Sequence, residues 1–256
     1  MIKNKKLIVA NWKMNPTTLA EAKKLFENIK KTASKVKNIQ TVICPPSVYL
    51  SELGKLYSGR RIALGAQDVF WEKKGAYTGE QSSKMIKDIG AKYVIIGHSE
   101  RRERGETNKM VNKKIITSLE EGLNVILCIG EKVRDLQALY LKFLEEEIRS
   151  ALLGVQKKRI NNLIIAYEPI WAIGKTADNA ISPHQMHEIY IFIKKIITGL
   201  YDKKSALKTT ILYGGSVESY NVKLLLTKGE AEGFLVGHNS LNSDQFGEIL
   251  KIASNN

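Results

Sequence analysis

The sequence lacks a membrane-spanning run, because no stretch of its 256 residues approaches the roughly 18 consecutive apolar residues that a span needs. Near the N-terminus, the apolar run Leu7–Ala10 is too short for the core of a signal peptide, and the polar residues Asn11 and Lys13 follow it at once. We therefore expect a cytoplasmic protein that does not associate with membranes.

The chain also has little cysteine and histidine. Its two cysteines, Cys44 and Cys128, lie far apart in the sequence, and its four histidines are scattered without the spacing of metal ligands. Both cysteines end apolar runs, so we expect buried, reduced thiols and no need for an oxidising compartment. The sequence predicts neither a metal site nor a cofactor.

Acidic residues are outnumbered, with 26 Asp and Glu against 40 Lys and Arg, and the net charge is +14. Such a surplus attracts anions, either nucleic acid or small phosphorylated substrates, but it also describes an ordinary lysine-rich solvated surface. Lysines such as Lys23, Lys30 and Lys37 alternate with an apolar helical stripe and form no continuous block with interleaved aromatics. This pattern argues against a nucleic-acid partner.

Eight short apolar runs recur along the chain, and most are separated by stretches with helical periodicity. Each run is almost continuously apolar, as in strands of a parallel sheet whose two faces are both buried. The predicted strands are Leu7–Ala10, Thr41–Cys44, Ile62–Ala66, Tyr93–Gly97, Val125–Ile129, Leu163–Tyr167, Thr210–Tyr213 and Gly233–Gly237.

Apolar residues spaced three and four apart mark the intervening helices. Thr107 and the pair Ser182-Pro183 are typical of helix N-termini. Three predicted apolar helix faces are formed by Leu19, Ala22, Leu25, Phe26, Ile29, Ala33 and Val36; by Leu136, Leu139, Tyr140, Phe143, Leu144 and Ile148; and by Met186, Ile189, Tyr190, Ile193, Ile196, Ile197 and Leu200.

The repeat of strand and helix, without a Gly/Ser linker or low-complexity segment, predicts the α/β class and a (β/α)8 TIM barrel. We expect residues 1–256 to form one such domain. A doubly wound open sheet is the rival architecture. It usually carries a G-x-G-x-x-G phosphate loop after its first strand, whereas here Asn-Trp-Lys-Met-Asn follows.

Working residues of such barrels lie at the carboxyl ends of the strands, and polar residues of this chain gather there. Each of these residues, taken singly, also has a purely structural explanation. Lys13 could be a surface lysine, His98 a hydrogen-bonded histidine at a strand end, and Gly214-Gly215-Ser216 a tight turn. Glu168 directly follows a buried strand, where a carboxylate is costly unless it is used.

Together these residues describe a site for a phosphorylated carbonyl compound. Glu168 can remove a proton next to a carbonyl group, His98 can donate a hydrogen bond to the developing enolate, and Lys13 supplies positive charge. Backbone N–H groups of the turns at 214–216 and 236–238 can converge on a phosphate. No metal is needed if His98 and Lys13 carry the developing charge.

Several segments resemble the signature motifs of the triosephosphate isomerase family, in matching order and spacing over nearly the whole chain. They are Asn11-Trp12-Lys13-Met14-Asn15, Gly75-Ala76-Tyr77-Thr78-Gly79-Glu80, Gly97-His98-Ser99-Glu100-Arg101-Arg102, Leu127-Cys128-Ile129-Gly130-Glu131, Ala166-Tyr167-Glu168-Pro169-Ile170-Trp171-Ala172-Ile173-Gly174 and Tyr213-Gly214-Gly215-Ser216-Val217.

The resemblance implies reversible isomerisation of D-glyceraldehyde 3-phosphate and dihydroxyacetone phosphate through an enediol(ate), in glycolysis and gluconeogenesis. Glu168 would shuttle the proton, His98 would act as a neutral electrophile at the start of a short helix opened by Ser99, and Lys13 would stabilise charge. The resemblance makes Asn11 and Glu100 supporting residues. It implies that Gly174, Ser216, Gly237 and His238 bind phosphate through the backbone.

The resemblance also implies a mobile lid from Glu168 through Ala177 and a homodimer. In the dimer, the Gly75–Glu80 loop with Thr78 would contact the partner and support its Asn11, Lys13 and His98.

Two departures from the family pattern concern the phosphate end of the site. The usual lid sequence Ala-Ile-Gly-Thr-Gly-Lys-Thr-Ala lacks its Thr-Gly pair here, since Gly174 is followed by Lys175. The usual contact of the missing glycine with Ser216 therefore cannot form in the same way. His238 replaces the usual glycine, and its imidazole either turns outward or adds a donor near the phosphate.

Two other functions remain as alternatives. One is an isomerase of a four-carbon ketose phosphate of the erythrulose phosphate type, since a shortened lid could admit a longer substrate. A catalytically silent barrel used for binding is the other alternative, and the intact set of Lys13, His98 and Glu168 speaks against it.

Overall fold

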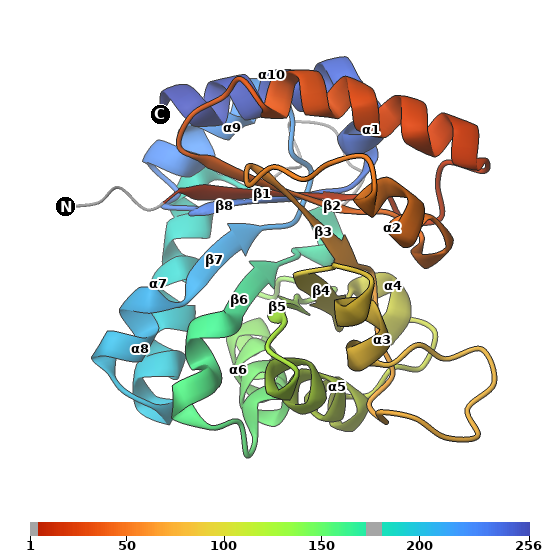
Figure 1. Ribbon diagram of the computed structural model, residues 1–256. Coiled ribbons are helices and arrows are strands. Elements are labelled where there is room, and N and C mark those ends of the chain that lie inside the picture. The colour runs from red at the N-terminus through yellow and green to blue at the C-terminus, as the bar shows by residue number, and fades with distance from the viewer. Residues whose placement is uncertain (1–4, 173–180) are drawn as a thin grey trace.

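In the computed structural model, which describes residues 5–172 and 181–256, eight parallel strands close into a barrel in chain order (Figure 1). The predicted barrel architecture is confirmed. The strands are β1 (Lys6–Asn11), β2 (Ile39–Cys44), β3 (Ile62–Ala66), β4 (Tyr93–Ile96), β5 (Asn124–Ile129), β6 (Leu163–Tyr167), β7 (Thr210–Tyr213) and β8 (Gly233–Val236).

Both faces of the strands are buried, which explains why each apolar run is nearly continuous. Along β1, Leu7 and Val9 belong to a cluster made of strand residues only, whereas Ile8 and Ala10 pack in the larger cluster that includes the helices. Cys44 and Cys128 are buried, unpaired members of the inner cluster, as predicted. Burial raises the pKa of both thiols.

The helices cover the outside of the barrel (Figure 1), and their N-termini follow the sequence signals. Thr107 accepts a hydrogen bond from Met110 N, and Ser182 forms a capping box with Gln185. The α-helices are α1 (Leu19–Ala33), α2 (Ser47–Gly54), α3 (Ser83–Asp88), α4 (Ser99–Arg102), α5 (Asn108–Glu120), α6 (Leu139–Leu152), α7 (Pro183–Leu200), α8 (Lys203–Lys208), α9 (Ser219–Thr227) and α10 (Ser243–Asn255), and short 3-10 turns are η1 (Lys157–Asn162), η2 (Ile170–Ala172) and η4 (His238–Leu241).

The predicted apolar face is wrong at the start of α6. Leu136 lies before the helix and is fully exposed, and Leu139 and Phe143 are exposed as well. The carboxylate of Asp135 accepts hydrogen bonds from the backbone N–H groups of Leu139 and Tyr140. This local cap starts the helix at residue 139, and only the later part of the face is buried.

A buried ion cluster ties the segment after β3 to α5. The Lys114 ammonium group donates to both Asp68 oxygens at 2.9 and 2.8 Å and also to Glu106 Oε1, and Arg101 Nη2 lies 2.7 Å from Asp68 Oδ2. Burial raises the pKa of Asp68 although Lys114 and Arg101 oppose it. These cations therefore compensate carboxylates that are costly to bury.

The substitution Lys114→Met should destabilise the protein strongly, because it leaves Asp68 and Glu106 with less compensating charge in the interior. We expect a loss of about 3–5 kcal/mol in the free energy of unfolding, measured by urea denaturation. Lys23→Met is the control, since Lys23 pairs with Glu52 on the surface and should contribute about 0–1 kcal/mol. Equal losses in the two variants would contradict this account.

Candidate active site

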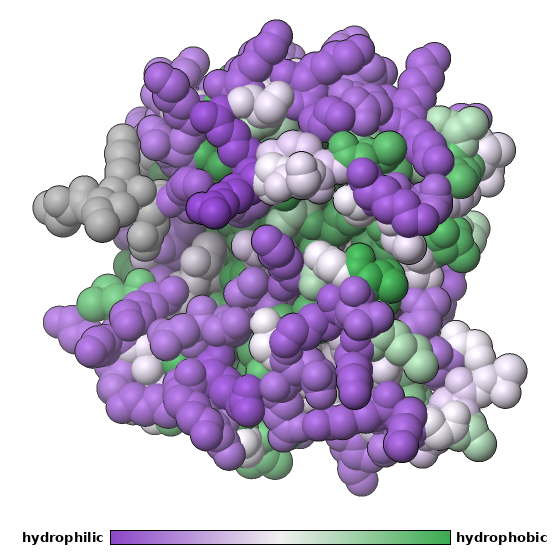
Figure 2. All heavy atoms as spheres, in the orientation of Figure 1, coloured by the Kyte–Doolittle hydropathy of each residue, from purple (hydrophilic) through white to green (hydrophobic). Residues whose placement is uncertain are grey.

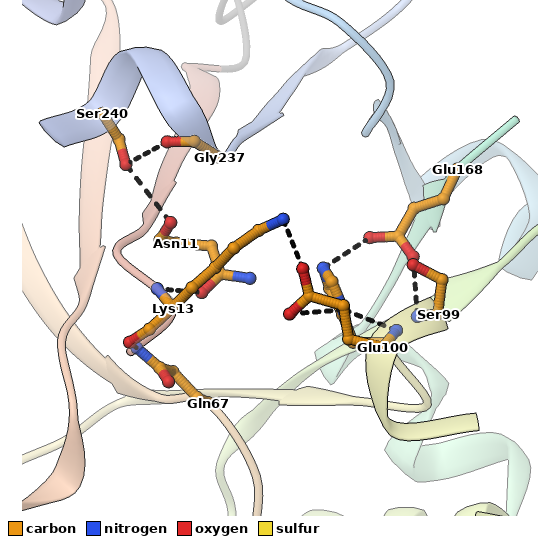
Figure 3. Close-up of polar contacts among 9 residues, drawn as sticks. Asn11, Lys13, Gln67, Ser99, Glu100, Glu168, Gly237 and Ser240 are labelled. Carbon is orange, nitrogen blue, oxygen red and sulfur yellow. Dashed lines mark hydrogen bonds and ion pairs between the residues drawn. The ribbon is translucent and has the colours of Figure 1, made fainter. Parts of the chain in front are cut away.

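The carboxyl ends of five strands border one cavity of about 450 Å³. Its lining includes most of the residues that the sequence singles out, although they lie far apart along the chain. The lining residues are Asn11, Lys13, His98, Glu168, Gly214, Gly215, Ser216, Val217, Glu218, Leu235, Val236, Gly237, His238 and Asn239. Figure 3 shows how the polar groups around this cavity face one another.

Lys13 follows β1 in a left-handed backbone conformation with φ of 52°. The Asn11 side chain accepts a hydrogen bond from Lys13 N at 3.0 Å and so fixes this turn. The ammonium group of Lys13 lies 2.6 Å from Glu100 Oε1 (Figure 3). Partial burial raises the pKa of Glu100, but the hydrogen bond and charge of Lys13 outweigh it, so the pKa lies below its ordinary value.

His98 caps the four-residue helix α4, which begins at Ser99, where the family resemblance implies a short helix. Its Nδ1 atom accepts a hydrogen bond from Glu100 N at 3.2 Å. An accepting Nδ1 carries a lone pair, so in the neutral ring the proton is on Nε2. The ring is almost buried, at 8% exposure, and its Nε2 edge faces the cavity side where Glu168 lies.

Glu168 is 2% exposed, and its carboxylate is held by the segment that carries His98. Oε2 accepts a hydrogen bond from Ser99 N at 3.1 Å (Figure 3), and Oε1 lies 3.3 Å from His98 Nε2. The base and the imidazole predicted from separate motifs are therefore in direct contact. A backbone N–H at the first residue of a helix satisfies a carboxylate well, which offsets part of the cost of its burial.

The turn after β7 contributes Gly214, Gly215 and Ser216 to the cavity wall. The N–H of Gly214 donates to Tyr167 O at 2.8 Å, which joins the ends of β7 and β6. This N–H is therefore not directed at an anion in the cavity. The hydroxyl of Ser216 donates to Ala172 O at 3.1 Å, which links this turn to the segment after β6.

The turn after β8 lies beside Lys13. A Cβ atom on Gly237 would lie 3.3 Å from Lys13 Cε, so the lysine side chain passes directly over this glycine. His238 begins η4, is exposed, and borders the cavity. The hydroxyl of Ser240 donates to Gly237 O at 2.6 Å and lies 3.3 Å from Asn11 O, which joins this turn to β1.

Sequence reasoning missed two residues that organise the rim. The Gln67 amide donates to Lys13 O at 2.7 Å and to Cys44 O at 2.9 Å, and so connects the ends of three strands. Glu131 Oε1 accepts hydrogen bonds from Tyr167 and Trp171, both at 2.8 Å. Each lies one or two residues beyond a strand, so the strand-end rule contained the signal.

Some predicted residues lie elsewhere. Gly174 and the second half of the predicted lid, residues 173–177, lie outside the described residues. Thr78 belongs to the exposed segment 72–80, which extends away from the barrel between β3 and α3 (Figure 1) and does not border the cavity of its own chain. Over the described ranges, no cluster of three or more His, Cys, Asp or Glu side chains could hold a metal ion. No helix in those ranges could cross a membrane.

Comparison with known proteins gives one consistent result. The family model described as "Triosephosphate isomerase" matches residues 6–253. Proteins named "Triosephosphate isomerase" are 43% identical over 95% of this chain in Thermoanaerobacter pseudethanolicus, 40% over 96% in Dictyoglomus turgidum and 41% over 97% in Geotalea uraniireducens. The match covers 98%, 99% and 99% of those relatives, respectively. The chain therefore belongs to the triosephosphate isomerase family.

Proposed function

We propose that this protein interconverts D-glyceraldehyde 3-phosphate and dihydroxyacetone phosphate by proton transfer, as a cytoplasmic enzyme of glycolysis and gluconeogenesis. The observation that carries the proposal is the contact of Glu168 Oε1 with His98 Nε2 at 3.3 Å, on a cavity that Lys13 also borders. A general base, a hydrogen-bond donor and a fixed cation thus meet around a space large enough for a triose phosphate. The reaction needs no cofactor.

Glu168 acts as the base. Its carboxylate takes the proton from the carbon next to the carbonyl group and returns it to the neighbouring carbon, which exchanges aldose and ketose. Substrate entering between Glu168 and His98 replaces their direct contact. Burial of Glu168 keeps water from the carboxylate, and a base without its hydration shell is better able to accept a carbon-bound proton.

His98 and Lys13 stabilise the enediolate. The Nε2 proton of His98, fixed by the bond from Glu100 N to Nδ1, can be donated to the oxygen that gains charge. Triosephosphate isomerase is itself a standard example of a neutral histidine used in this way. Lys13 adds a full positive charge, and Asn11 holds the turn that carries it.

The phosphate group binds at the other end of the cavity. We assign it to backbone N–H groups of the turns containing Gly215–Ser216 and Gly237–His238, with Gly174 as a further contact expected from the family resemblance. The proximity of Lys13 to Gly237 supports this assignment, because it brings a cation beside the proposed anion site. Gly214 is not among the proposed phosphate-binding residues, because its N–H donates a hydrogen bond to Tyr167 O.

The four-carbon alternative gains no support from the relatives, which carry the name triosephosphate isomerase. A catalytically silent barrel is also disfavoured, because Lys13, His98 and Glu168 border the same cavity.

A coupled triose-phosphate isomerisation assay on the purified protein tests the activity and the base together. Glu168→Gln should lower kcat by about 10² to 10⁴-fold, because an amide cannot accept the proton. Glu188→Gln, on the exposed surface of α7, is the control and should leave kcat unchanged. Undiminished activity of Glu168→Gln would remove this residue from the proposed role, and an inactive wild-type protein would overturn the proposed reaction.

His238→Ala separates backbone from side-chain binding of phosphate. Because we assign the contact to the backbone, KM should rise by less than about tenfold, the factor that corresponds to ~1.4 kcal/mol. His184→Ala is the matched control, since His184 is an exposed histidine on α7. A larger rise in KM for His238→Ala alone would show that the imidazole itself binds the phosphate.

We also propose that the protein is a homodimer in which segment 75–80, with Thr78, enters the partner subunit. Met14 borders a small pocket together with Lys13 and Glu100, and other exposed apolar side chains come from α2, segment 75–80 and α3. Met14, Val48, Tyr77 and Met85 are all exposed. Hydrogen bonds join the parts of this surface: Gln81 donates to Ser47, and Gln67 donates to the backbone of Lys13. An apolar surface of this kind is typical of an interface between subunits.

Met14→Glu tests the dimer, because it places a charge where the partner subunit would exclude water. Sedimentation should show monomers at concentrations at which the unchanged protein is dimeric. Leu207→Glu is the control, since Leu207 is also exposed but lies on α8, across the barrel from segment 75–80 in Figure 1. A monomeric unchanged protein, or a Met14→Glu variant that remains dimeric, would contradict the proposed interface.

A further inference from the structure

Glu147 on α6 is a buried carboxylate that none of the roles above uses. It is 2% exposed; its Oε2 accepts a hydrogen bond from Gly130 N at 2.9 Å, and its Oε1 lies 3.3 Å from Arg102 Nη1. Burial raises the pKa of Glu147 to about 7, although Arg102 and the Gly130 N–H both lower it. A carboxylate kept so deep in the protein needs partners of this kind to be tolerated.

Arg102 connects Glu147 to the backbone between β4 and His98. It is the last residue of α4, and its Nε donates to Gly97 O at 2.8 Å, the carbonyl group directly before His98. Its Nη1 also donates to Asn108 Oδ1 at 2.6 Å. The planar guanidinium group therefore fixes the end of β4 and the start of α5 relative to Glu147.

Gly130 connects Glu147 to Glu168. The Glu168 N–H donates to Ile129 O at 2.8 Å, so the backbone of Glu168 crosses the end of β5. A Cβ atom on Gly130 would lie only 1.7 Å from Glu168 O, which means that the two backbones are in direct contact. A shift of Gly130 therefore displaces the backbone of Glu168.

We propose that Arg102, which is partly buried, and Glu147, which is buried, are a pair of positioning residues that sets the separation between His98 Nε2 and Glu168 Oε1. One end of the pair holds Gly97, the residue before His98, and the other end holds Gly130, on which Glu168 rests. Neither Arg102 nor Glu147 borders the cavity, so they act through the two catalytic residues and not on substrate. The catalytic part of this inference rests on the proposed function.

The test replaces the ion pair by apolar side chains in the double variant Arg102→Met/Glu147→Leu. Apolar replacement of a buried ion pair often preserves stability, so fold and positioning can be separated. The control carries the same two changes at Arg149 and Glu145, which form an ion pair with Nε to Oε1 distance 2.7 Å on the exposed side of α6. Four measurements are compared: the thermal midpoint, kcat, KM and the inhibition constant of inorganic phosphate.

The positioning variant should keep its thermal midpoint, its KM and its phosphate inhibition constant, and should lose about 10- to 100-fold in kcat. A displacement of about 1 Å between reacting groups is sufficient for a loss of this size. The control should match the wild type in all four measurements. An unchanged kcat would overturn the proposal, and so would a kcat that falls only together with thermal midpoint and phosphate binding, since that result indicates a structural role.

Two further measurements keep the proposal falsifiable. If the double variant does not fold, Glu147→Gln is measured instead, because it retains an acceptor for Gly130 N but loses the ion pair; an unchanged kcat then overturns the inference. If the wild type lacks isomerase activity, the proposed function is wrong, but this result does not test the positioning of His98 and Glu168. A crystal structure of the folded variant then decides the positioning role, and a His98–Glu168 separation that stays at 3.3 Å would overturn it.

Discussion

The pairing of β1 with β8 is the contact on which the site depends. It aligns Leu7–Ala10 with Gly233–Val236 and closes the barrel. Because all eight strands are parallel, closure brings every carboxyl end to one rim, and residues from opposite ends of the chain become neighbours. Lys13 consequently lies against Gly237, and Ser240 lies against Asn11. An open sheet of the same strands would leave the lysine far from the proposed phosphate end.

Buried charge is the second constraint, and several buried carboxylates lie near the carboxyl ends of the strands. Glu168, Glu147 and Glu131 are each 2% exposed, and each carboxylate has hydrogen-bond donors from a neighbouring strand end or helix. The raised pKa of Glu147 reflects chiefly its burial and partly the nearby Glu168. Such groups persist only where their partners are held rigidly, so the same contacts that compensate the charges also restrain the residues proposed to be catalytic. Hydrophilic side chains cover most of the face in Figure 2, whereas these three carboxylates are buried.

Much of the fold could be predicted, because periodicity and caps are local properties. The strand ranges agree with the structure to within two residues, and Thr107 and Ser182 cap helices as expected. The spacing of Leu136 predicts a place on a helical face, but the hydrogen bonds of Asp135 to Leu139 N and Tyr140 N mark a later start of the helix. Gln67 lies directly after a strand, where functional residues are expected, but a single polar residue at such a position does not reveal its partners. Its importance lies in two carbonyl groups contributed by other strands.

The sequence alone determined the class of architecture and indicated the chemistry of the site. The reason is that apolar runs, capping residues and the motifs around Lys13, His98 and Glu168 each lie within a short stretch of sequence. Only the tertiary structure decided which groups meet. Glu168 contacts His98 at 3.3 Å, the Gly214 N–H is already bonded, and Arg102 reaches Glu147 across α4 and α6. The physical reason is that hydrogen bonds and ion pairs depend on distances of a few ångströms, and such distances between remote segments exist only after the barrel has closed.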